Sequence, residues 1–458
     1  MAGKKSPKIA VNATSPKTTG WVLTAGLVLA TALILGGCGS SSGSSGLANG
    51  LMSNASDGSQ ADGFSKAPTL SANGRFVLFD SVATDQVAED TDAYADVMLR
   101  DRMAPNSRLI SVSTDGVKGL AISDQAFINA DASRVVFASG AALVAADGNG
   151  FNDVYLRDLT TGTTSRISTA FAGGDPNNFS GAPSITPDNR YVLYRSRATN
   201  LLAGTDANLS MDIFLYDTVD DVTERVSLAD GGGESNGHSE TAGISDDGRY
   251  VVFDAIADNL VTGDTNGVWD VFLHDRTTGS TIRLSETAGG TGGNGNSRAP
   301  SISGDGSHVV FHSAADNLVV DDTNLKNDVF LYRLSDEVLS RISVHSDGSQ
   351  ASGHSKVTPT SAISANGSRV AFHSDAGDLD PSVEVNGFND VFVHNVPSAS
   401  TTLVSLTPSR VSGNHESDSA AISADGNHVA FHSYASDLVA TTTRQQWEIF
   451  AITLSSIP

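Results

Sequence analysis

The sequence predicts an all-β fold: a seven-bladed β-propeller of four-stranded antiparallel blades, with the last blade completed by an N-terminal strand. Two observations predict it. One aromatic position recurs at roughly 58-residue spacing, at Phe79, Phe137, Tyr194, Phe253, Phe311, Phe372 and Phe431. An acid follows it in every copy, at Asp96, Asp153, Asp212, Asp270, Asp328, Asp390 and Glu448. A fixed period of this size indicates stacked units that cannot bury their apolar faces alone.

Each copy contains four strand-like runs bounded by turn residues. In the fifth copy they are 300–303, 307–313, 328–332 and 339–343. An Asx-Gly pair such as Asn73-Gly74 separates the first two runs and predicts a type I′ hairpin turn. A Thr-Thr-Gly turn that ends at Gly162 or Gly279 separates the last two. Because no run has a helical period, each copy is expected to form one antiparallel sheet.

The last copy lacks its fourth strand, because only residues 453–458 follow its third run. The stretch 50–60 looks like 341–350, which is a fourth strand and its exit loop. We therefore expect the N-terminal stretch to complete the last blade, which closes the ring and removes a free sheet edge. The sequence therefore predicts a single propeller domain over residues 48–458.

The repeat resembles a known family. Pro-Ser-Ile-Ser at 300–303, Asp-Gly at 305–306 and Asp-Val-Phe-Leu at 328–331 are similar to the TolB-like β-propeller repeat, a WD-like, PD-type module of bacterial envelope proteins. The resemblance covers nearly all of the mature chain and implies a propeller in the cell envelope. The family spans protein-binding scaffolds, lipoproteins and propeller domains of peptidases. The only Trp-Asp pair, Trp269-Asp270, is placed differently from that of eukaryotic WD repeats.

Residues 1–37 have the parts of a secretory signal: four lysines, then an apolar run at 21–35 and small residues. The order Leu35-Gly-Gly-Cys38 resembles a bacterial lipobox, which implies a lipid on Cys38, and Gly39 favours the outer membrane of a Gram-negative bacterium, facing the periplasm or the exterior. An uncleaved signal anchor is the alternative. Cys38 is the only cysteine, so no intrachain disulfide forms. Residues 38–47 form a flexible Gly/Ser-rich tether.

The charge of the chain limits its partners. Asp and Glu number 52 against 28 Lys and Arg, which gives a formal net charge of −24. This charge excludes nucleic acid and direct docking on anionic lipid, so the membrane contact is expected only through the lipid on Cys38. It favours a cationic envelope protein or peptide, or a divalent metal.

Acidic loops precede the third strands and suggest Ca²⁺, which prefers oxygen ligands. The candidate ligands are Asp90, Asp92, Asp96, Asp147, Asn149, Asp153, Asp206, Asn208, Asp212, Asp264, Asn266, Asp270, Asp322, Asn324 and Asp328, with Glu384, Asn386 and Asp390 in the sixth copy. No bidentate Glu follows in register, so the favoured interpretation is structural, with the side chains fixing a tight turn through backbone N–H groups. No cofactor is then required. In the seventh copy, Thr442, Arg444 and Glu448 cannot bind a metal in the same way.

Histidines occupy two kinds of position. His312, His373 and His432 stand in Phe-His-Ser triplets, where we expect hydrogen bonds between blades rather than a shared metal. The loops from each fourth strand to the next first strand carry another set of candidates. They are His238, His354 and His415, with Phe64 and Phe179 near the corresponding positions. Such varied loops on a repeated scaffold are expected to rim the central channel and to form the partner or ligand site.

No catalytic residue is assigned, since the sequence has no Gly-x-Ser-x-Gly elbow that leads from a strand into a helix, no His-Glu-x-x-His and no cysteine nucleophile; the Gly-x-Ser-x-Gly matches at 39–43 and 233–237 stand in Gly-rich stretches with no helical period after them. The predicted function is that of a lipid-anchored, non-enzymatic envelope scaffold that binds a protein or ligand. Two alternatives stay open. One is a propeller carbohydrate-active enzyme, hydrolase or lyase, that uses rim carboxylates. The other is a structural component of an envelope assembly.

Overall fold

The computed structural model describes residues 49–204, 206–359, 361–383, 386–441 and 443–456, which belong to one compact unit, Leu47–Pro458. The predicted signal peptide and tether, with Cys38, lie outside the described residues, as do Glu384 and Thr442. No helix in the described part of the chain is long and apolar enough to cross a bilayer.

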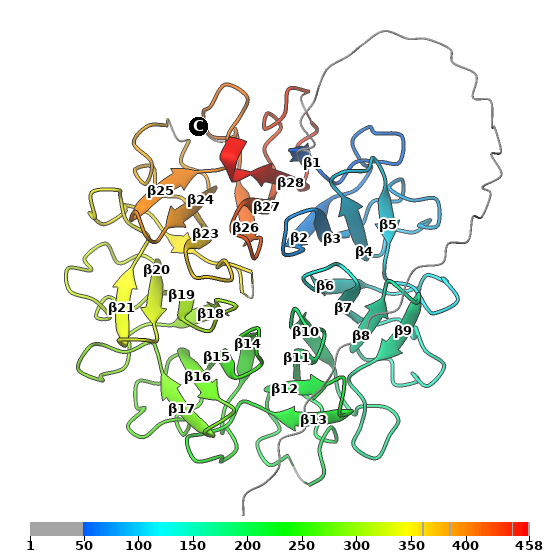
Figure 1. The fold of residues 1–458 in the computed structure, drawn as a ribbon, viewed down its shortest axis with the longest axis horizontal. Coiled ribbons are helices and arrows are strands. Elements are labelled where there is room, and N and C mark those ends of the chain that lie inside the picture. Colours follow the sequence, from blue (N-terminus) through cyan, green and yellow to red (C-terminus); the bar gives the residue numbers. More distant parts are fainter. Residues whose placement is uncertain (1–48, 205, 360, 384–385, 442, 457–458) are drawn as a thin grey trace, which may run out of the picture. The chain divides into compact units, whose positions relative to one another are not determined.

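Seven four-stranded antiparallel sheets surround a central axis, as the sequence predicts (Figure 1). Blade one holds β2 (Ser65–Leu70), β3 (Phe76–Ser81), β4 (Asp96–Asp101) and β5 (Ser107–Leu109). Blade two holds β6 (Ser123–Ile128), β7 (Arg134–Ser139), β8 (Asp153–Asp158) and β9 (Thr163–Arg166). Blade three holds β10 (Ser180–Ile185), β11 (Tyr191–Ser196), β12 (Asp212–Asp217) and β13 (Val222–Arg225). Blade four holds β14 (Ser239–Ile244), β15 (Tyr250–Ala255), β16 (Asp270–Asp275) and β17 (Ser280–Arg283).

The remaining blades follow the same order from the axis outward. Blade five holds β18 (Ser297–Ile302), β19 (His308–Ser313), β20 (Asp328–Arg333) and β21 (Val338–Arg341). Blade six holds β22 (Ser355–Lys356), β23 (Arg369–Ser374), β24 (Asp390–Asn395) and β25 (Ser400–Leu403). Blade seven holds β26 (Ser417–Ile422), β27 (His428–Ser433), β28 (Glu448–Thr453) and β1 (Gly50–Leu51), and a 3-10 turn, Leu454–Ser456, follows β28.

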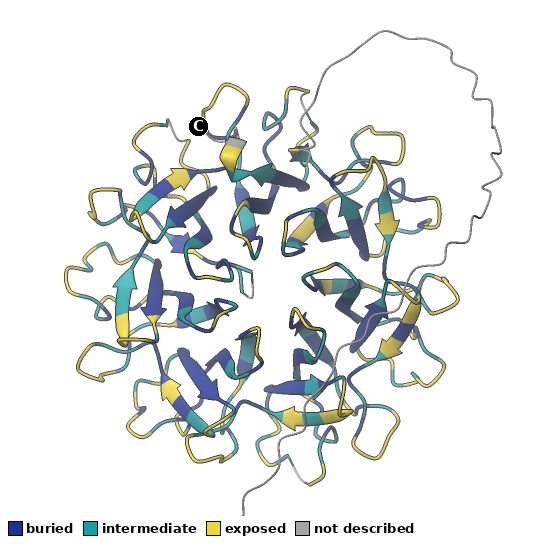
Figure 2. Cartoon of the chain, viewed as in Figure 1, coloured by how far each residue is buried: buried dark blue, intermediate teal, exposed yellow. Residues whose placement is uncertain are grey.

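The core lies between neighbouring blades rather than inside any one of them. Seven clusters of buried apolar side chains are described, and each joins two adjacent blades. The second and third strands of each blade are the most buried, whereas the fourth strands keep exposed positions (Figure 2). In six blades, the repeated aromatic of the second strand stacks on a ring of the third, as Phe311 does on Phe330 at 5.9 Å between centroids. Because each blade depends on its neighbours, the units stack as expected of repeats.

The hairpin turns differ from the predicted type I′. In blade one the N–H of Gly74 donates to the carbonyl of Ser71 at 2.9 Å, and only Gly74, not Asn73, has a positive φ. A type I turn followed by a glycine in the left-handed region satisfies the same Asx-Gly signature. The side chain of Asn73 explains the choice, since its Oδ1 accepts the N–H of Arg75 at 3.1 Å. A Cβ at position 74 would also lie 2.3 Å from the ring of His428.

The innermost strands start earlier than expected and are bulged. In blade five the strand begins at Ser297 rather than at residue 300, with a register shift between Arg298 and Ser301. Ala299 within the bulge has a φ of 56°. The corresponding shift occurs in six blades. The bulge disrupts regular pairing at this point of the strand nearest the axis.

The N-terminal strand closes the ring, as predicted. Gly50 and Leu51 of β1 pair antiparallel with Ala451 and Phe450 of β28. The contact continues beyond the strand, where the N–H of Met52 donates to the carbonyl of Ile449 at 2.7 Å. The last blade therefore has four strands like the others, and its outer edge comes from the other end of the chain.

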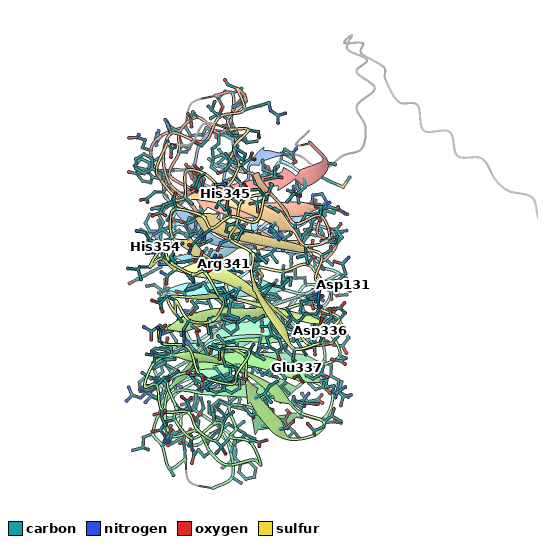
Figure 3. All side chains as sticks on the ribbon, turned by 90° about the vertical axis from the view of Figure 1, so that its left-hand side faces the viewer. Asp131, Asp336, Glu337, Arg341, His345 and His354 are labelled. Atoms are coloured by element: carbon teal, nitrogen blue, oxygen red, sulfur yellow. The ribbon has the colours of Figure 1, made fainter. Side chains whose placement is uncertain are left out.

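The loops divide the ring into two faces. The loop face carries the loops that precede the third strands and those that follow the fourth strands. The turn face carries the tight hairpin turns between strands one and two and between strands three and four. Figure 3 shows His354 at the loop face, with Asp131, Asp336 and Glu337 at the opposite, turn face.

Candidate functional site

A buried carboxylate opens nearly every third strand on the loop-face side. In blades one to six its Oδ1 accepts the hydroxyl of a serine that follows the fourth strand. The pairs are Asp96–Ser111, Asp153–Ser168, Asp212–Ser227, Asp270–Ser285, Asp328–Ser343 and Asp390–Ser405, at 2.5–2.7 Å. We call this pair the Asp–Ser clasp. It fixes the outer hairpin, because the serine Oγ also accepts a backbone N–H of the third strand, at 3.0 Å from Val329 in blade five.

Arginines from the fourth strands face the acidic loops of blades two to five. Arg341 lies 3.2 Å from Asp322 and 3.5 Å from the clasp residue Asp328. The equivalent arginines are Arg166, Arg225 and Arg283, which approach Asp147 and Asp153, Asp206 and Asp212, and Asp264 and Asp270. Burial nevertheless raises the pKa of both Asp212 and Asp270 to about 6. These ions are paired inside the protein, which fits the structural interpretation of the loops.

In blade one a lysine, rather than an arginine, pairs with the acidic loop. Leu109 stands where blades two to five have arginine. Lys118 of the following loop supplies the cation. Its Nζ lies 3.1 Å from Asp90, 2.6 Å from Asp92 and 2.9 Å from Asp96. Burial alone would lower the pKa of Lys118, but these three carboxylates raise it above its ordinary value. The ammonium therefore stays charged in the position where a metal would need the same oxygens.

Two groups of carboxylates among the described residues are close enough to share a metal: Asp90, Asp92 and Asp96, and Asp206, Asp212 and Glu234. Lys118 pairs with all three acids of the first group and Arg225 with all three of the second. Ca²⁺ stays a prediction from the sequence, and at either group it would compete with a basic side chain. The loop amides Asn149, Asn208, Asn266 and Asn324 each donate to the clasp carboxylate of their own blade.

Blade six has the clasp but no described basic partner for it. Leu403 replaces the arginine, and Ser412 stands where blade one has Lys118. The Oδ2 of Asp390 is buried without a hydrogen-bond partner among the described residues, and burial raises the pKa of Asp390 to about 7. In blade seven, Glu448 keeps the clasp, because Ser53 donates to its carboxylate and accepts the N–H of Ile449, and the amides of Gln60 at 2.8 Å and Gln446 at 2.7 Å take the place of a basic partner.

The triplet histidines lie where blades meet, near the axis. The ring of His432 accepts the bulged N–H of Ala67 in blade one at 3.4 Å, which is the interblade bond expected from the sequence. The Nδ1 atoms of His312 and His373 are buried and have no described partner. Burial lowers the pKa of His373 to about 4, so its ring is neutral at physiological pH. No group of described histidines is close enough to share a metal.

The predicted rim residues do reach the loop face, but two of the histidines hold loops in place. The Nδ1 of His238 accepts the N–H of Met211, and that of His354 accepts the N–H of Asn327, both at 3.0 Å. Phe179, directly before β10, shares this strand position and is half-buried. His415 is one residue out of step, since Glu416 directly precedes β26.

An aromatic cluster crosses blades six, seven and one on the loop face. His415 stacks on Phe388 at 4.6 Å between ring centroids and lies 4.8 Å from Tyr434. Tyr434 contacts Trp447 at 5.6 Å. Phe64, with 43% of its surface exposed, adds a further ring across blade one. The sequence predicts His415 and Phe64 as site residues but does not single out the three rings that join them.

The channel along the axis contains two cavities lined by the innermost strands. One, of about 120 Å³, lies toward the turn face and is lined by all seven blades; its only described ionisable residue is Asp246. The other, of about 180 Å³, is lined by small and apolar residues of the bulges, such as Ala67, Pro68 and Pro183. Backbone hydrogen bonds between neighbouring turns, such as Ala365 N–H to Ala424 O at 2.9 Å, tie blades together at the turn-face end.

The candidates predicted from the sequence include neither the basic partners of the acidic loops nor the clasp serines. Their signal is present, because Arg-x-Ser recurs at Arg166-Ile-Ser168, Arg225-Val-Ser227, Arg283-Leu-Ser285 and Arg341-Ile-Ser343. A repeated basic residue beside a repeated acidic loop predicts an ion pair at the same point of each blade. Lys118 gives no such signal, because it belongs to one blade only.

No family model and no curated protein matches this sequence. Solved structures do match. A putative TolB from Agrobacterium tumefaciens is 18% identical, with a TM-score of 0.39, over 62% of this chain and 81% of its own. An oligogalacturonate lyase in complex with manganese is 11% identical, with a TM-score of 0.52, over 89% of this chain and 96% of its own. An oligogalacturonate lyase from Vibrio parahaemolyticus is 14% identical, with a TM-score of 0.50, over 88% and 96%. At these identities the likeness to the two lyase structures shows a shared propeller fold and no more.

Proposed function

We propose that this chain is a non-enzymatic binding module of the bacterial cell envelope, anchored through a lipid on Cys38, that holds a partner protein on its loop face. The observation that carries this proposal is the one-sided distribution of exposed apolar side chains. A propeller is a rigid frame, and function on such a frame depends on the loops it presents.

The loop face exposes far more large apolar side chains than the rest of the described surface. Thirteen lie in its loops: Phe64, Tyr94, Val117, Leu120, Ile122, Phe151, Phe171, Leu209, Ile256, Val320, Leu325, Phe388 and Val411. Five lie in the turns or outer strands: Met103, Val219, Val222, Ile282 and Val338. Apolar side chains gathered on one face, with aromatics among them, are typical of a protein interface.

The charge of the chain suggests the sign of the partner. At a formal net charge of −24, long-range attraction favours a cationic protein or peptide. Aromatic rings on the loop face suit such a partner as well, because lysine and arginine side chains bind aromatic faces.

A carbohydrate-active enzyme is the weaker alternative. Glycoside hydrolysis generally needs two carboxylates that flank the scissile bond. The described lining of the two axial cavities supplies one, Asp246, and the clasp carboxylates are already held by serines, with basic side chains added in blades one to five. This arrangement supports binding rather than catalysis.

Site-specific photocrosslinking in native envelopes tests the proposal. A photoreactive residue at Leu325 probes the loop face, and one at Val219 is a matched control on the turn face, since these side chains are 77% and 70% exposed. We expect a discrete protein adduct from position 325 and none from position 219. Equal adducts at both positions, or none at either, would contradict a loop-face partner.

A further inference from the structure

A polar cavity of about 200 Å³ lies between blades five and six on the loop face. It is lined by Asn327, His354, Lys356, His373, Asp375 and Asn389, all of which are polar. Two amides, two imidazoles, one ammonium and one carboxylate give the cavity donors and acceptors on several sides. An apolar ligand would gain nothing here, whereas a compact hydroxyl-bearing one would find partners for its polar groups.

Lys356 differs from the other cations at the same position of the innermost strand. Arg298 in blade five is neutralised by Asp254 at 2.9 Å and Glu240 at 2.5 Å. Lys66 in blade one lies 4.9 Å from the ring centroid of Phe64 and 5.7 Å from that of Trp447. The backbone of Lys356 pairs with β23, but its side chain makes no hydrogen bond, ion pair or ring contact with any described residue, and the residue lines the open cavity. Its ammonium is therefore the one cation of this position left for an outside partner.

Lys356 acts on Asp418 through its charge but forms no ion pair with a described residue, so its ammonium can still take an outside partner. Asp375 accepts the backbone N–H of His354 at 2.5 Å, and Asp418, behind the cavity, accepts the amide of Asn389 at 3.0 Å. Both carboxylates therefore already have donors. Because the Nδ1 of His354 accepts a backbone N–H, the neutral ring carries its proton on Nε2 and can donate a second hydrogen bond.

We propose that this cavity binds a small hydroxy-carboxylate of the size of one sugar-acid ring, with its carboxylate on Lys356 and His354. The hydroxyl groups would meet the side-chain amides of Asn327 and Asn389 and the carboxylate of Asp375. The volume is below the 300–1,000 Å³ typical of sites for drug-sized ligands, so a single ring is the fitting unit.

This proposal is independent of the partner protein proposed above, because it depends on the cavity and not on the exposed apolar side chains. If the chain binds a sugar acid but no protein, the cavity proposal stands and the partner-protein proposal fails. If it binds a protein but no sugar acid, the partner-protein proposal stands and the cavity proposal fails. The two experiments therefore fail separately.

Isothermal titration calorimetry of the full chain, supported by saturation-transfer NMR, tests the site with four probes. Glucuronate carries the ring and the carboxylate, glucose lacks the carboxylate, acetate lacks the ring, and serine adds an ammonium. We expect glucuronate to bind about tenfold or more tightly than the other three, because a charge-assisted contact is added to the hydroxyl contacts.

The matched variants are Lys356→Ala and Lys66→Ala, which remove the same residue type from the same strand position. Lys356→Ala should reduce the affinity for glucuronate about tenfold, to the level of glucose. Lys66→Ala should leave it unchanged, and unaltered melting temperatures show that both variants fold. No binding of glucuronate by the unmodified chain, equal binding of serine, or an unaffected Lys356→Ala variant would each overturn the proposal.

Discussion

Asp390 lacks the basic neighbour that the clasp aspartates of blades one to five have, and this changes its pKa. The other clasp aspartates of blades one to five face arginine or lysine, whereas Asp390 is buried beside Leu403 with no described cation. Burial therefore raises its pKa to about 7, far above the ordinary value for Asp. The native state keeps a proton here that the unfolded chain loses near pH 4.

This pKa predicts that stability falls as pH rises from about 4 to about 7, because the native state binds more protons than the unfolded state in this window. Asp390→Asn cannot ionise, so it should remove the loss and stabilise the chain at pH 8 by about 1–4 kcal/mol. At pH 4 the variant and the parent should melt alike. Thermal melting across this pH range measures the effect.

Asp328→Asn is the control, because its carboxylate faces Arg341. Removing that charge takes one of two carboxylate partners from the buried Arg341 and leaves Asp322, so Asp328→Asn should destabilise the chain at pH 8 by about 1–3 kcal/mol. If both variants shift the melting temperature in the same direction at pH 8, the assigned difference between blades five and six is wrong.

Lys118 predicts a second effect at the scale of single residues. Its ammonium pairs with three carboxylates that could otherwise share a divalent cation. Lys118→Ala leaves these carboxylates without a counter-charge, so Ca²⁺ should bind the variant at least about tenfold more tightly than the parent. Calorimetric titration with Ca²⁺ measures the affinity of the parent, of Lys118→Ala and of the reference variant Lys326→Ala. Equal affinity in the parent and in Lys118→Ala would mean that the ammonium does not compete.

At the scale of elements, the sequence predicts the strands better than their irregularities. The second and third strands follow from the aromatic and the acid, because burial on both faces demands apolar residues there. The turn type does not follow, because Asn73-Gly74 fits two turns and the Asn73 side chain selects one. The bulge at Ala299 has no local signal, since its N–H bonds Asp254 of the preceding blade.

The candidate site is predictable to a similar degree. Its placement in the loops follows from the variation at His354 and His415 on a repeated frame. The cavity beside Lys356 does not follow, because Asn327 and Asn389 come from two other loops, and only the packing of blades five and six brings them together.

β1 gives a prediction at the same scale. Deleting residues 47–55 removes the outer strand of blade seven and Ser53, which bonds the buried carboxylate of Glu448. We expect a loss of several kcal/mol, from the burial of Leu51 and Met52, the lost pairing and the unsatisfied acid. Chemical denaturation measures it against a chain that begins at Leu47 and keeps β1. An unfolding free energy within error of that control would be incompatible with ring closure by β1.

At the scale of the whole molecule, stability is distributed around a circle. Each apolar cluster belongs to two blades, so every blade has two neighbours only when the ring is closed. The exposed side chains of the loop face, such as Leu325, can then vary at little cost to the core, because they stand outside these clusters, whereas buried loop residues such as Leu318 belong to them. This separation explains how one repeated frame presents Lys356 and Phe388 in blade six and Trp447 in blade seven.

Anchoring by a lipid also belongs to this scale and remains a prediction. Cys38→Ser removes the only thiol and with it the predicted attachment point. We expect the protein to move from the membrane fraction to the soluble fraction, with an unchanged melting temperature because the propeller starts later in the chain. Fractionation followed by immunoblotting measures this. Retention of Cys38→Ser in the membrane would point to the uncleaved signal anchor instead.

The pairing of β1 with β28 has a consequence for how the protein is made. Asn49 and Thr453, which bond across the closure, stand 404 positions apart in the chain. A ribosome delivers the first of these long before the second, so six blades can assemble while the seventh waits for its final partner. Until translation ends, the nascent polypeptide has an unpaired strand edge on each side of the gap. These edges stay unpaired longer than any others in the ring, so chaperones that shield strand edges would be needed longest at this gap.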